Sequence, residues 1–428
     1  MVIKEVKNED INEKLLYTET QNGLKIYFMP KKGYIKKHAM FSTDYGSIDN
    51  KFIPIGEDKP LEVPEGIAHF LEHKLFEEPE VNIFEKFSDI GGSVNAFTSF
   101  NQTSYLFETI DNFYENLELL IKFVQSPYLT DKNVEKEKGI ISQEIRMYED
   151  DPGWKVYFNL LEAMYPSNPV RIDIAGTIDS ITNINKELLY KAYNTFYHPS
   201  NMVLFVVGDL DFKEIIKVVE KSEKKTKNKI SNIERIKSLE IEGINKSIVE
   251  YKMYTSNPIF HIGFKDKDIG KLGKSKVEKD LKTDIILDML FGNSSKFYNE
   301  FYEKGLIDSS FGANYTGKQS YGHSLIFGES NNPKLVYDNI IDLIEENPED
   351  ILKEKDFERI KHKYLGEFLL SFNSISSISQ MFTDFYFDEF LLTDYIDLIR
   401  KVRYTEIIER FKEHFNKDNT VLSIVNPL

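Results

Sequence analysis

Cysteine is absent from this sequence of 428 residues. Its absence excludes disulfides, thiolate metal ligands and a cysteine nucleophile. Long hydrophobic runs are missing as well, because the longest one, Met202–Val207, is far shorter than the roughly 20 residues of a membrane helix. The first residues are charged throughout and lack the apolar stretch of a secretory signal. We therefore expect a cytoplasmic protein with no membrane partner.

Arginine is also scarce, and acidic residues outnumber basic ones by 70 to 54. The net charge is −16, and arginine occurs at only seven positions: 146, 171, 235, 359, 400, 403 and 410. Nucleic acids and anionic membranes require an excess of lysine and arginine, so neither is expected as a partner. Apolar residues make up 41% of the chain and aromatic residues 13%, which is enough for packed cores. At this length, two or three domains are expected.

The sequence contains two related halves. Residues 114–121 (YENLELLI) resemble residues 337–344 (YDNIIDLI), and residues 201–207 (NMVLFVV) resemble residues 419–425 (NTVLSIV). The matches keep the same order and are separated by about 220 residues, which favours a duplicated unit. Lysine-rich residues 217–246, which lack aromatic side chains, divide the chain near its middle. We therefore predict domains at 1–216 and 247–428, joined by a linker at 217–246.

Each half is predicted to be an α+β unit, with an antiparallel sheet that has helices packed on one face. In the first half, period-two patterns predict strands near 24–29, 38–44, 93–98, 103–109 and 202–207. Helical spacing of apolar residues predicts helices near 65–77, 81–89, 112–125, 133–149 and 186–197.

Two histidines stand one helical turn apart in the segment VPEGIAHFLEHKLFEEPE. On a helix, His69, Glu72 and His73 share a stripe, because positions i, i+3 and i+4 lie on one face. Two imidazoles in this arrangement can each give one nitrogen to a metal ion. A glutamate beside them can accept a proton from water on that metal. His-x-x-Glu-His is the inverzincin pattern; the alternative is an ordinary amphipathic helix with surface histidines.

A catalytic zinc site has three protein ligands and one open position. No other histidine is close in sequence, so we expect a carboxylate from residues 133–154. Glu137 and Glu144 are two turns apart on the same face of the predicted helix, and Glu135, Glu149, Asp150 and Asp151 are further acidic residues in this segment. From the residues alone, Glu144 is one choice among several.

The chain resembles the pitrilysin/insulinase-type zinc metallopeptidase family, in a bacterial branch similar to mitochondrial processing peptidase. The resemblance rests on four segments in the family's order: GIAHFLEHKLF (66–76), GGSVNAFTS (91–99), EKGIISQEI (137–145) and FYHPSNMVLFVVGDLD (196–211). It covers essentially the whole chain, both halves included.

The resemblance implies a role for each residue of the site. His69, His73 and Glu144 would bind Zn²⁺, and Glu72 would be the catalytic base. Glu137 would support the ligands from behind, as a second-layer carboxylate does. Asn95, Ala96 and Phe97 match the family's edge strand, where a substrate pairs as an additional strand.

One feature of the family is missing. Active members carry an arginine and a tyrosine in the second half, where both hold the substrate. The matching stretch, residues 294–312, places Tyr302 and Asp308 at these positions, and no arginine occurs between Arg235 and Arg359. The second half also lacks His-x-x-Glu-His. We therefore expect a heterodimer with a related, zinc-less subunit that supplies the two residues, with a homodimer as the alternative.

These patterns lead to one main hypothesis: a zinc-dependent endopeptidase subunit that cleaves short or unfolded peptides with a metal-activated water. The alternatives are a non-catalytic subunit that keeps the family fold as a scaffold, and a peptide-binding subunit. The intact Glu72 favours the enzyme, because metal binding alone does not require a base.

Overall fold

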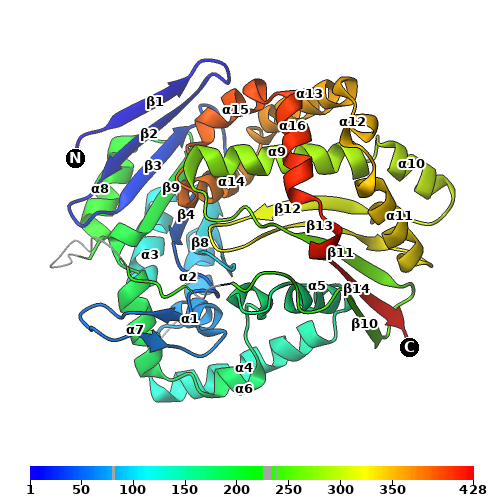
Figure 1. Cartoon of the computed structure of the whole chain (residues 1–428). Helices are drawn as coiled ribbons and strands as arrows, with labels where there is room; N and C mark the ends of the chain where they lie inside the picture. Colours follow the sequence, from blue (N-terminus) through cyan, green and yellow to red (C-terminus); the bar gives the residue numbers. More distant parts are fainter. Residues whose placement is uncertain (80–81, 225–232, 238–239) are drawn as a thin grey trace.

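The N-terminal half of the computed structural model is built on a seven-stranded sheet (Figure 1). The structure describes residues 1–428 except 80–81, 225–232 and 238–239. The strand order is β1-β2-β3-β9-β4-β8-β7, and all neighbours are antiparallel except β3 and β9. The strands are β1 (Lys4–Asn8), β2 (Glu13–Glu19), β3 (Lys25–Pro30), β4 (Lys37–Thr43), β7 (Gly92–Thr98), β8 (Thr103–Thr109) and β9 (Met202–Gly208); β5 (Lys51–Phe52) and β6 (Leu61–Glu62) form a separate pair.

The helices of this half bury one apolar stripe each. In α4, for example, the side chain of Thr130 caps the first turn, and Val134, Ile141 and Ile145 face the core. β7 is left at the edge of the sheet, next to α1. The helices are α1 (Ile67–Leu75), α2 (Ile83–Asp89), α3 (Phe113–Val124), α4 (Asp131–Glu149), α5 (Pro152–Met164), α6 (Ile178–Thr182), α7 (Lys186–Phe196) and α8 (Phe212–Ser222).

The C-terminal half repeats this plan on a five-stranded sheet, ordered β10-β14-β11-β13-β12. Its strands are β10 (Ile248–Met253), β11 (Ile259–Lys265), β12 (Gly312–Gly317), β13 (Gly322–Glu329) and β14 (Thr420–Pro427). Its helices are α9 (Gly273–Phe291), α10 (Lys296–Glu303), α11 (Pro333–Glu345), α12 (Pro348–Ile351), α13 (Glu354–Ser371), α14 (Ile375–Phe387), α15 (Tyr395–Lys401) and α16 (Tyr404–His414). The α+β class and the two related halves are therefore as predicted.

The halves exchange one helix each. Helix α5 of the first half packs against β10, β11 and β14, whereas α14 of the second half packs against β4 and β9 (Figure 1). The approach of α5 is so close that a Cβ atom at Gly263 would lie 2.2 Å from Cε of Met164. Each sheet therefore has helices of its own half on one face and a helix of the other half on the second face.

The segment between the halves is attached to both of them. The predicted linker, 217–246, includes the end of α8, and its residues 225–232 and 238–239 lie outside the described residues. Arg235 pairs with Asp49 of the first half, 2.9 Å away. Glu240 pairs with Lys265 of β11 at 2.6 Å and accepts a hydrogen bond from the backbone N–H of Asn168, also at 2.6 Å.

Among the described helices, none is long and apolar enough to cross a bilayer.

Candidate metal centre

Helix α1 presents the two histidines because its opposite face is apolar. Ile67, Phe70 and Leu71 are fully or almost fully buried in the core of the first half. The imidazole rings of His69 and His73, one turn apart, meet edge to face with their centroids 4.5 Å from each other. The local pattern that predicted a shared stripe is therefore realised in the helix.

Helix α4 crosses α1 and brings the third group. Nε2 of His69 lies 3.6 Å from Oε1 of Glu144, and Nε2 of His73 lies 3.5 Å from Oε2 of the same carboxylate. One donor atom from each of the three side chains fits within a span of 4.8 Å. Among the described residues, this is the one group of histidine and acidic side chains close enough to hold a metal ion.

The geometry of this group fits zinc. A tetrahedral zinc ion with bonds of roughly 2.1 Å keeps its donor atoms about 3.4 Å apart, close to the two nitrogen–oxygen distances found here. These distances are too long for good hydrogen bonds. Burial lowers the pKa of His69 to about 4, so its imidazole is neutral at pH 7, the form that binds a metal. Two imidazoles and one carboxylate are a donor set used by catalytic zinc.

Glu137 lies behind His73, on the side away from Glu144. Its Oε1 is 3.1 Å from Nδ1 of His73, and its Oε2 is 3.4 Å from Nζ of Lys74. Lys74 is fully buried and also forms an ion pair with Glu77. Burial raises the pKa of Glu137, but the hydrogen bond with His73 and the nearby Lys74 outweigh it, so the pKa is lowered. An ionised Glu137 fixes the ring of His73 with Nε2 directed at Glu144.

Glu72 lies beside the histidines and is almost completely buried. Burial raises the pKa of its carboxyl, while a hydrogen bond from the hydroxyl of Thr98, 2.7 Å from Oε2, opposes that rise. Thr98 ends β7, the edge strand that carries Asn95, Ala96 and Phe97. The backbone N–H of Ala96 meets the side-chain oxygen of Asn95 at 2.9 Å. The sheet edge that could receive a peptide therefore runs next to the carboxylate that could act as a base.

Sequence reasoning missed three side chains that hold these groups: Lys74, Thr98 and Tyr148. The hydroxyl of Tyr148 donates to Oε1 of Glu144 at 2.8 Å. A signal existed for Tyr148, because it follows Glu144 by four residues and so lies on the same helical face. The metal-binding roles and the substrate-strand role stay predictions at this point.

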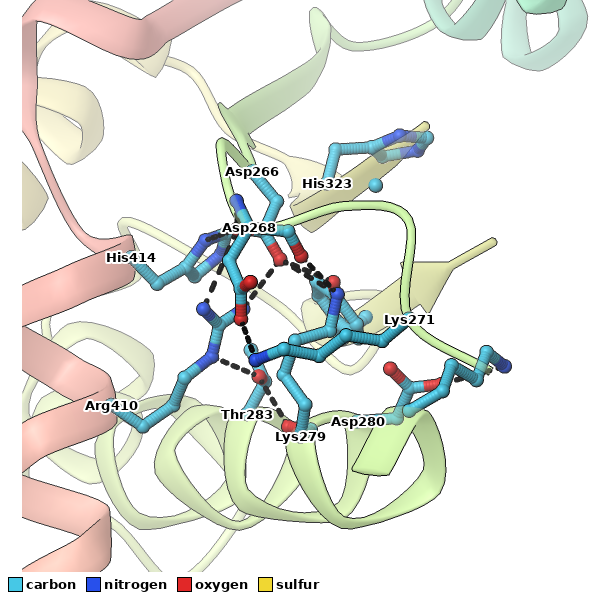
Figure 2. Close-up of polar contacts among 12 residues, drawn as sticks. Asp266, Asp268, Lys271, Lys279, Asp280, Thr283, His323, Arg410 and His414 are labelled. Carbon is cyan, nitrogen blue, oxygen red and sulfur yellow. Dashed lines mark hydrogen bonds and ion pairs between the residues drawn. The ribbon is translucent and has the colours of Figure 1, made fainter. Parts of the chain in front are cut away.

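The corresponding place in the second half has different chemistry. Helix α9 lies along β12 as α1 lies along β7, and it carries Lys279 and Thr283. Figure 2 shows these two side chains in a cluster around Asp266 and Arg410. Asp266 is 2.6 Å from Nη2 of Arg410 and 3.3 Å from Nζ of Lys279, and Nε of Arg410 donates to Thr283 at 2.8 Å. A buried ion cluster thus joins α9 to its neighbours in the second half, whereas α1 of the first half carries the histidines.

Tyr302 and Asp308 are the residues matched to the family's arginine and tyrosine in the sequence analysis. Tyr302 lies on α10 with half of its surface exposed and stacks on Tyr298. Asp308 accepts the backbone N–H of Ser310 at 2.8 Å in the turn before β12.

Comparison with known proteins places both halves in one family. The family model described as "Insulinase (Peptidase family M16)" matches residues 56–178, and the model described as "Peptidase M16 inactive domain" matches residues 183–364. Over 427 residues the chain is 42% identical to the "Uncharacterized zinc protease YmfH" of Bacillus subtilis (strain 168), and 100% of both chains is covered.

Solved structures agree with this result. The crystal structure of a putative M16-like peptidase from Alicyclobacillus acidocaldarius has a TM-score of 0.93 at 38% identity, covering 97% of this chain and 99% of that one. Pitrilysin shares the fold, with a TM-score of 0.74 at 16% identity, but the match covers 99% of this chain and only 46% of pitrilysin. From the family models and the similarity over its full length, the chain belongs to the M16 peptidase family, the insulinase family.

Proposed function

We propose that this chain is the zinc-bearing subunit of an endopeptidase that cleaves short or unfolded peptides. The observation that carries the proposal is the group formed by His69, His73 and Glu144, whose donor atoms lie within 4.8 Å of one another. Glu72 lies in α1 together with the two histidines, and its carboxylate contacts Thr98 of the edge strand β7. Relatives named zinc proteases support the choice of metal.

Each residue around the proposed metal position has a separate role in the reaction. Zinc held there would polarise a peptide carbonyl and lower the pKa of water at its open position. Glu72 takes the proton from the attacking water and later delivers it to the leaving amine. Thr98 binds Oε2 of Glu72, which leaves Oε1 to handle the proton. Glu137 keeps the ring of His73 oriented throughout.

The edge of β7 gives the substrate a place to bind. Residues Asn95, Ala96 and Phe97 lie on this strand, which has β8 on one side and no strand on the other among the described residues. A peptide added here would pair through main-chain hydrogen bonds, with little dependence on its sequence. Such pairing requires an extended backbone, which supports short or unfolded peptides as the proposed substrates.

A partner subunit completes the site in this proposal. The sequence has no arginine between Arg235 and Arg359. Pitrilysin, by contrast, is about twice the length matched by this chain. The exchanged helices α5 and α14 attach the two halves of this chain to each other. We therefore propose a heterodimer with a related subunit that lacks the histidines and supplies arginine and tyrosine.

The substitution Glu72→Gln tests the role of the base. The variant keeps the shape of the side chain and the three metal ligands, but it cannot accept a proton. We expect it to fold normally and to retain zinc, while cleavage of a fluorescence-quenched, unstructured peptide by the assembled enzyme falls by a factor of about 100 or more.

Two measurements accompany this assay. Elemental analysis reports whether the Glu72→Gln variant still contains zinc, and a binding assay with the same peptide reports its affinity. Undiminished cleavage by the variant would refute the assignment of Glu72. Peptide binding by the wild-type assembly without any cleavage would instead support the alternative of a peptide-binding subunit.

A further inference from the structure

We propose that Tyr148 is a positioning residue for the third metal ligand, Glu144, and that Trp154 and Asp173 hold it in place. The inference rests on the proposed metal site and adds three residues that the metal-binding motif does not contain. It concerns the side of the site opposite to Glu137, where the sequence analysis named no supporting group.

Tyr148 controls one oxygen of the ligand. Its hydroxyl donates to Oε1 of Glu144 at 2.8 Å, one helical turn further along α4. This oxygen faces His69, whereas the other, Oε2, faces His73. A carboxylate on a helix surface can rotate about several bonds, and the hydroxyl selects the rotamer in which each oxygen faces one histidine. Tyr148 thereby does for Glu144 what Glu137 does for His73.

Trp154 fixes the ring of Tyr148. The two rings are stacked, with their centroids 4.5 Å apart and an angle of 16° between their planes. Trp154 lies in the first turn of α5, where its backbone N–H donates to the capping side chain of Asp151 at 2.8 Å. Its indole N–H donates to Oδ2 of Asp173, and the other oxygen of Asp173 accepts the N–H of Ala175 at 2.9 Å. Trp154 is therefore fixed by two hydrogen bonds, one from its backbone N–H to Asp151 and one from its indole N–H to Asp173.

The loop that contains Asp173 returns to the start of the histidine helix. Gly66, directly before α1, has a φ of +85°, and a Cβ atom there would lie 2.2 Å from the carbonyl oxygen of Ala175. The hydroxyl of Ser180 donates to the carbonyl of Glu65 at 2.9 Å. A continuous series of contacts thus runs from Glu144 through Tyr148, Trp154 and Asp173 to the helix of His69. It fixes how far the third ligand lies from the other two.

This arrangement should be measurable as metal affinity. Residues that orient metal ligands typically contribute a factor of about 10 to 100 to affinity or activity when they are removed. Tyr148→Phe removes only the hydroxyl and keeps the ring stacked on Trp154. We therefore expect zinc affinity, measured by competition with a chelator, to fall by a factor of about 10 to 100.

Tyr404→Phe is the matched control. Tyr404 is also half-buried and also donates a hydrogen bond, at 2.6 Å, to the carbonyl of Leu352 in the second half. We expect this variant to bind zinc like the wild type. The thermal midpoint of both variants is measured without metal, so that a general loss of stability can be recognised. Equal zinc affinity in Tyr148→Phe and the wild type would overturn the proposal.

The part played by Trp154 is tested separately. Trp154→Leu leaves the hydroxyl of Tyr148 in the chain but removes the ring that holds it, and we expect zinc affinity to fall severalfold. Unchanged zinc affinity in Trp154→Leu would overturn the role of Trp154.

Failure of the proposed function would give a different result. A wild-type chain that binds no zinc, or a His69→Ala variant that binds zinc as well as the wild type, would refute the metal site itself.

Discussion

Thr98 is the residue that best separates metal binding from chemistry at this site. Its hydroxyl touches Glu72 and none of the three proposed ligands among the contacts described above. It also lies 3.4 Å from the hydroxyl of Thr103 on β8, so it is part of the sheet as well as of the site. Removal of the hydroxyl should release Glu72 without disturbing the histidines.

We predict that Thr98→Val keeps zinc but lowers the rate of peptide cleavage by a factor of about 10 or more. Valine has nearly the same shape and keeps a β-branched residue in the strand, so the fold should not change. Peptide cleavage and zinc content are measured on the same preparation. Loss of zinc together with activity would show that Thr98 acts on the ligands rather than on the base.

Candidate site residues could be predicted from the sequence where they lie close together along the chain, and not where distant segments bring them together. His69, Glu72 and His73 could be recognised because they lie within one helical turn. The search for the third ligand could be narrowed to the acidic residues of one predicted helix, and the resemblance to the family then selected Glu144. Thr98 could not be linked to Glu72, because the contact joins a helix and a strand and depends on how the two pack.

At the scale of elements, the ion cluster around Asp266 joins segments of the second half that are far apart in the sequence. Asp266 follows β11 and contacts Lys279 of α9, Arg410 of α16 and Tyr315 of β12, as seen in part in Figure 2. Burial raises the pKa of Asp266, but His414 and Arg410 outweigh it and hold the pKa well below its usual range. Four elements are therefore joined through one buried carboxylate.

We predict that Asp266→Asn lowers the free energy of unfolding by about 3–5 kcal/mol at neutral pH, because Arg410 and Lys279 then remain buried without a counter-charge. Since the pKa of Asp266 is lower in the folded state, its contribution is complete above the unfolded value, near pH 4, and is lost as the pH falls further. Denaturant titrations at pH 7 and below pH 4 measure the difference.

Glu300→Gln provides the control for this experiment. Glu300 forms an ion pair with Lys304 on the exposed surface of α10, and we expect its removal to leave stability unchanged within error. A wild-type-like stability of Asp266→Asn at pH 7 would show that the cluster does not stabilise the fold.

At the scale of the molecule, the exchange of α5 and α14 is the feature that the sequence did not reveal. The two helices occupy matching places, 152–164 and 375–387, and each has 13 residues. Their apolar stripes indicate that they are buried but not which sheet they cover. That choice depends on packing between distant segments, such as the close approach of Met164 to Gly263. Five strands of the first sheet could be predicted from period-two patterns, but β1, β2 and the parallel pairs β3–β9 and β10–β14 could not.

Because the sequence has no arginine between Arg235 and Arg359, we predict that activity depends on a second chain. The isolated chain should cleave a quenched, unstructured peptide slowly, and a related subunit with the missing arginine and tyrosine should raise the rate by a factor of about 100 or more, as expected for groups that stabilise the transition state. Activity is measured together with the mass of the assembly by light scattering. Full activity of the monomer or homodimer would contradict the heterodimer.

The most direct test of the whole account is the metal content of the purified chain. Elemental analysis should find one zinc ion per wild-type chain, and almost none in His73→Ala and Glu144→Ala, each of which removes one of three ligands. Tyr404→Phe serves as a folded control and should retain the ion. A wild-type chain that takes up no zinc when it is supplied, or ligand variants that keep their full content, would contradict the central claim.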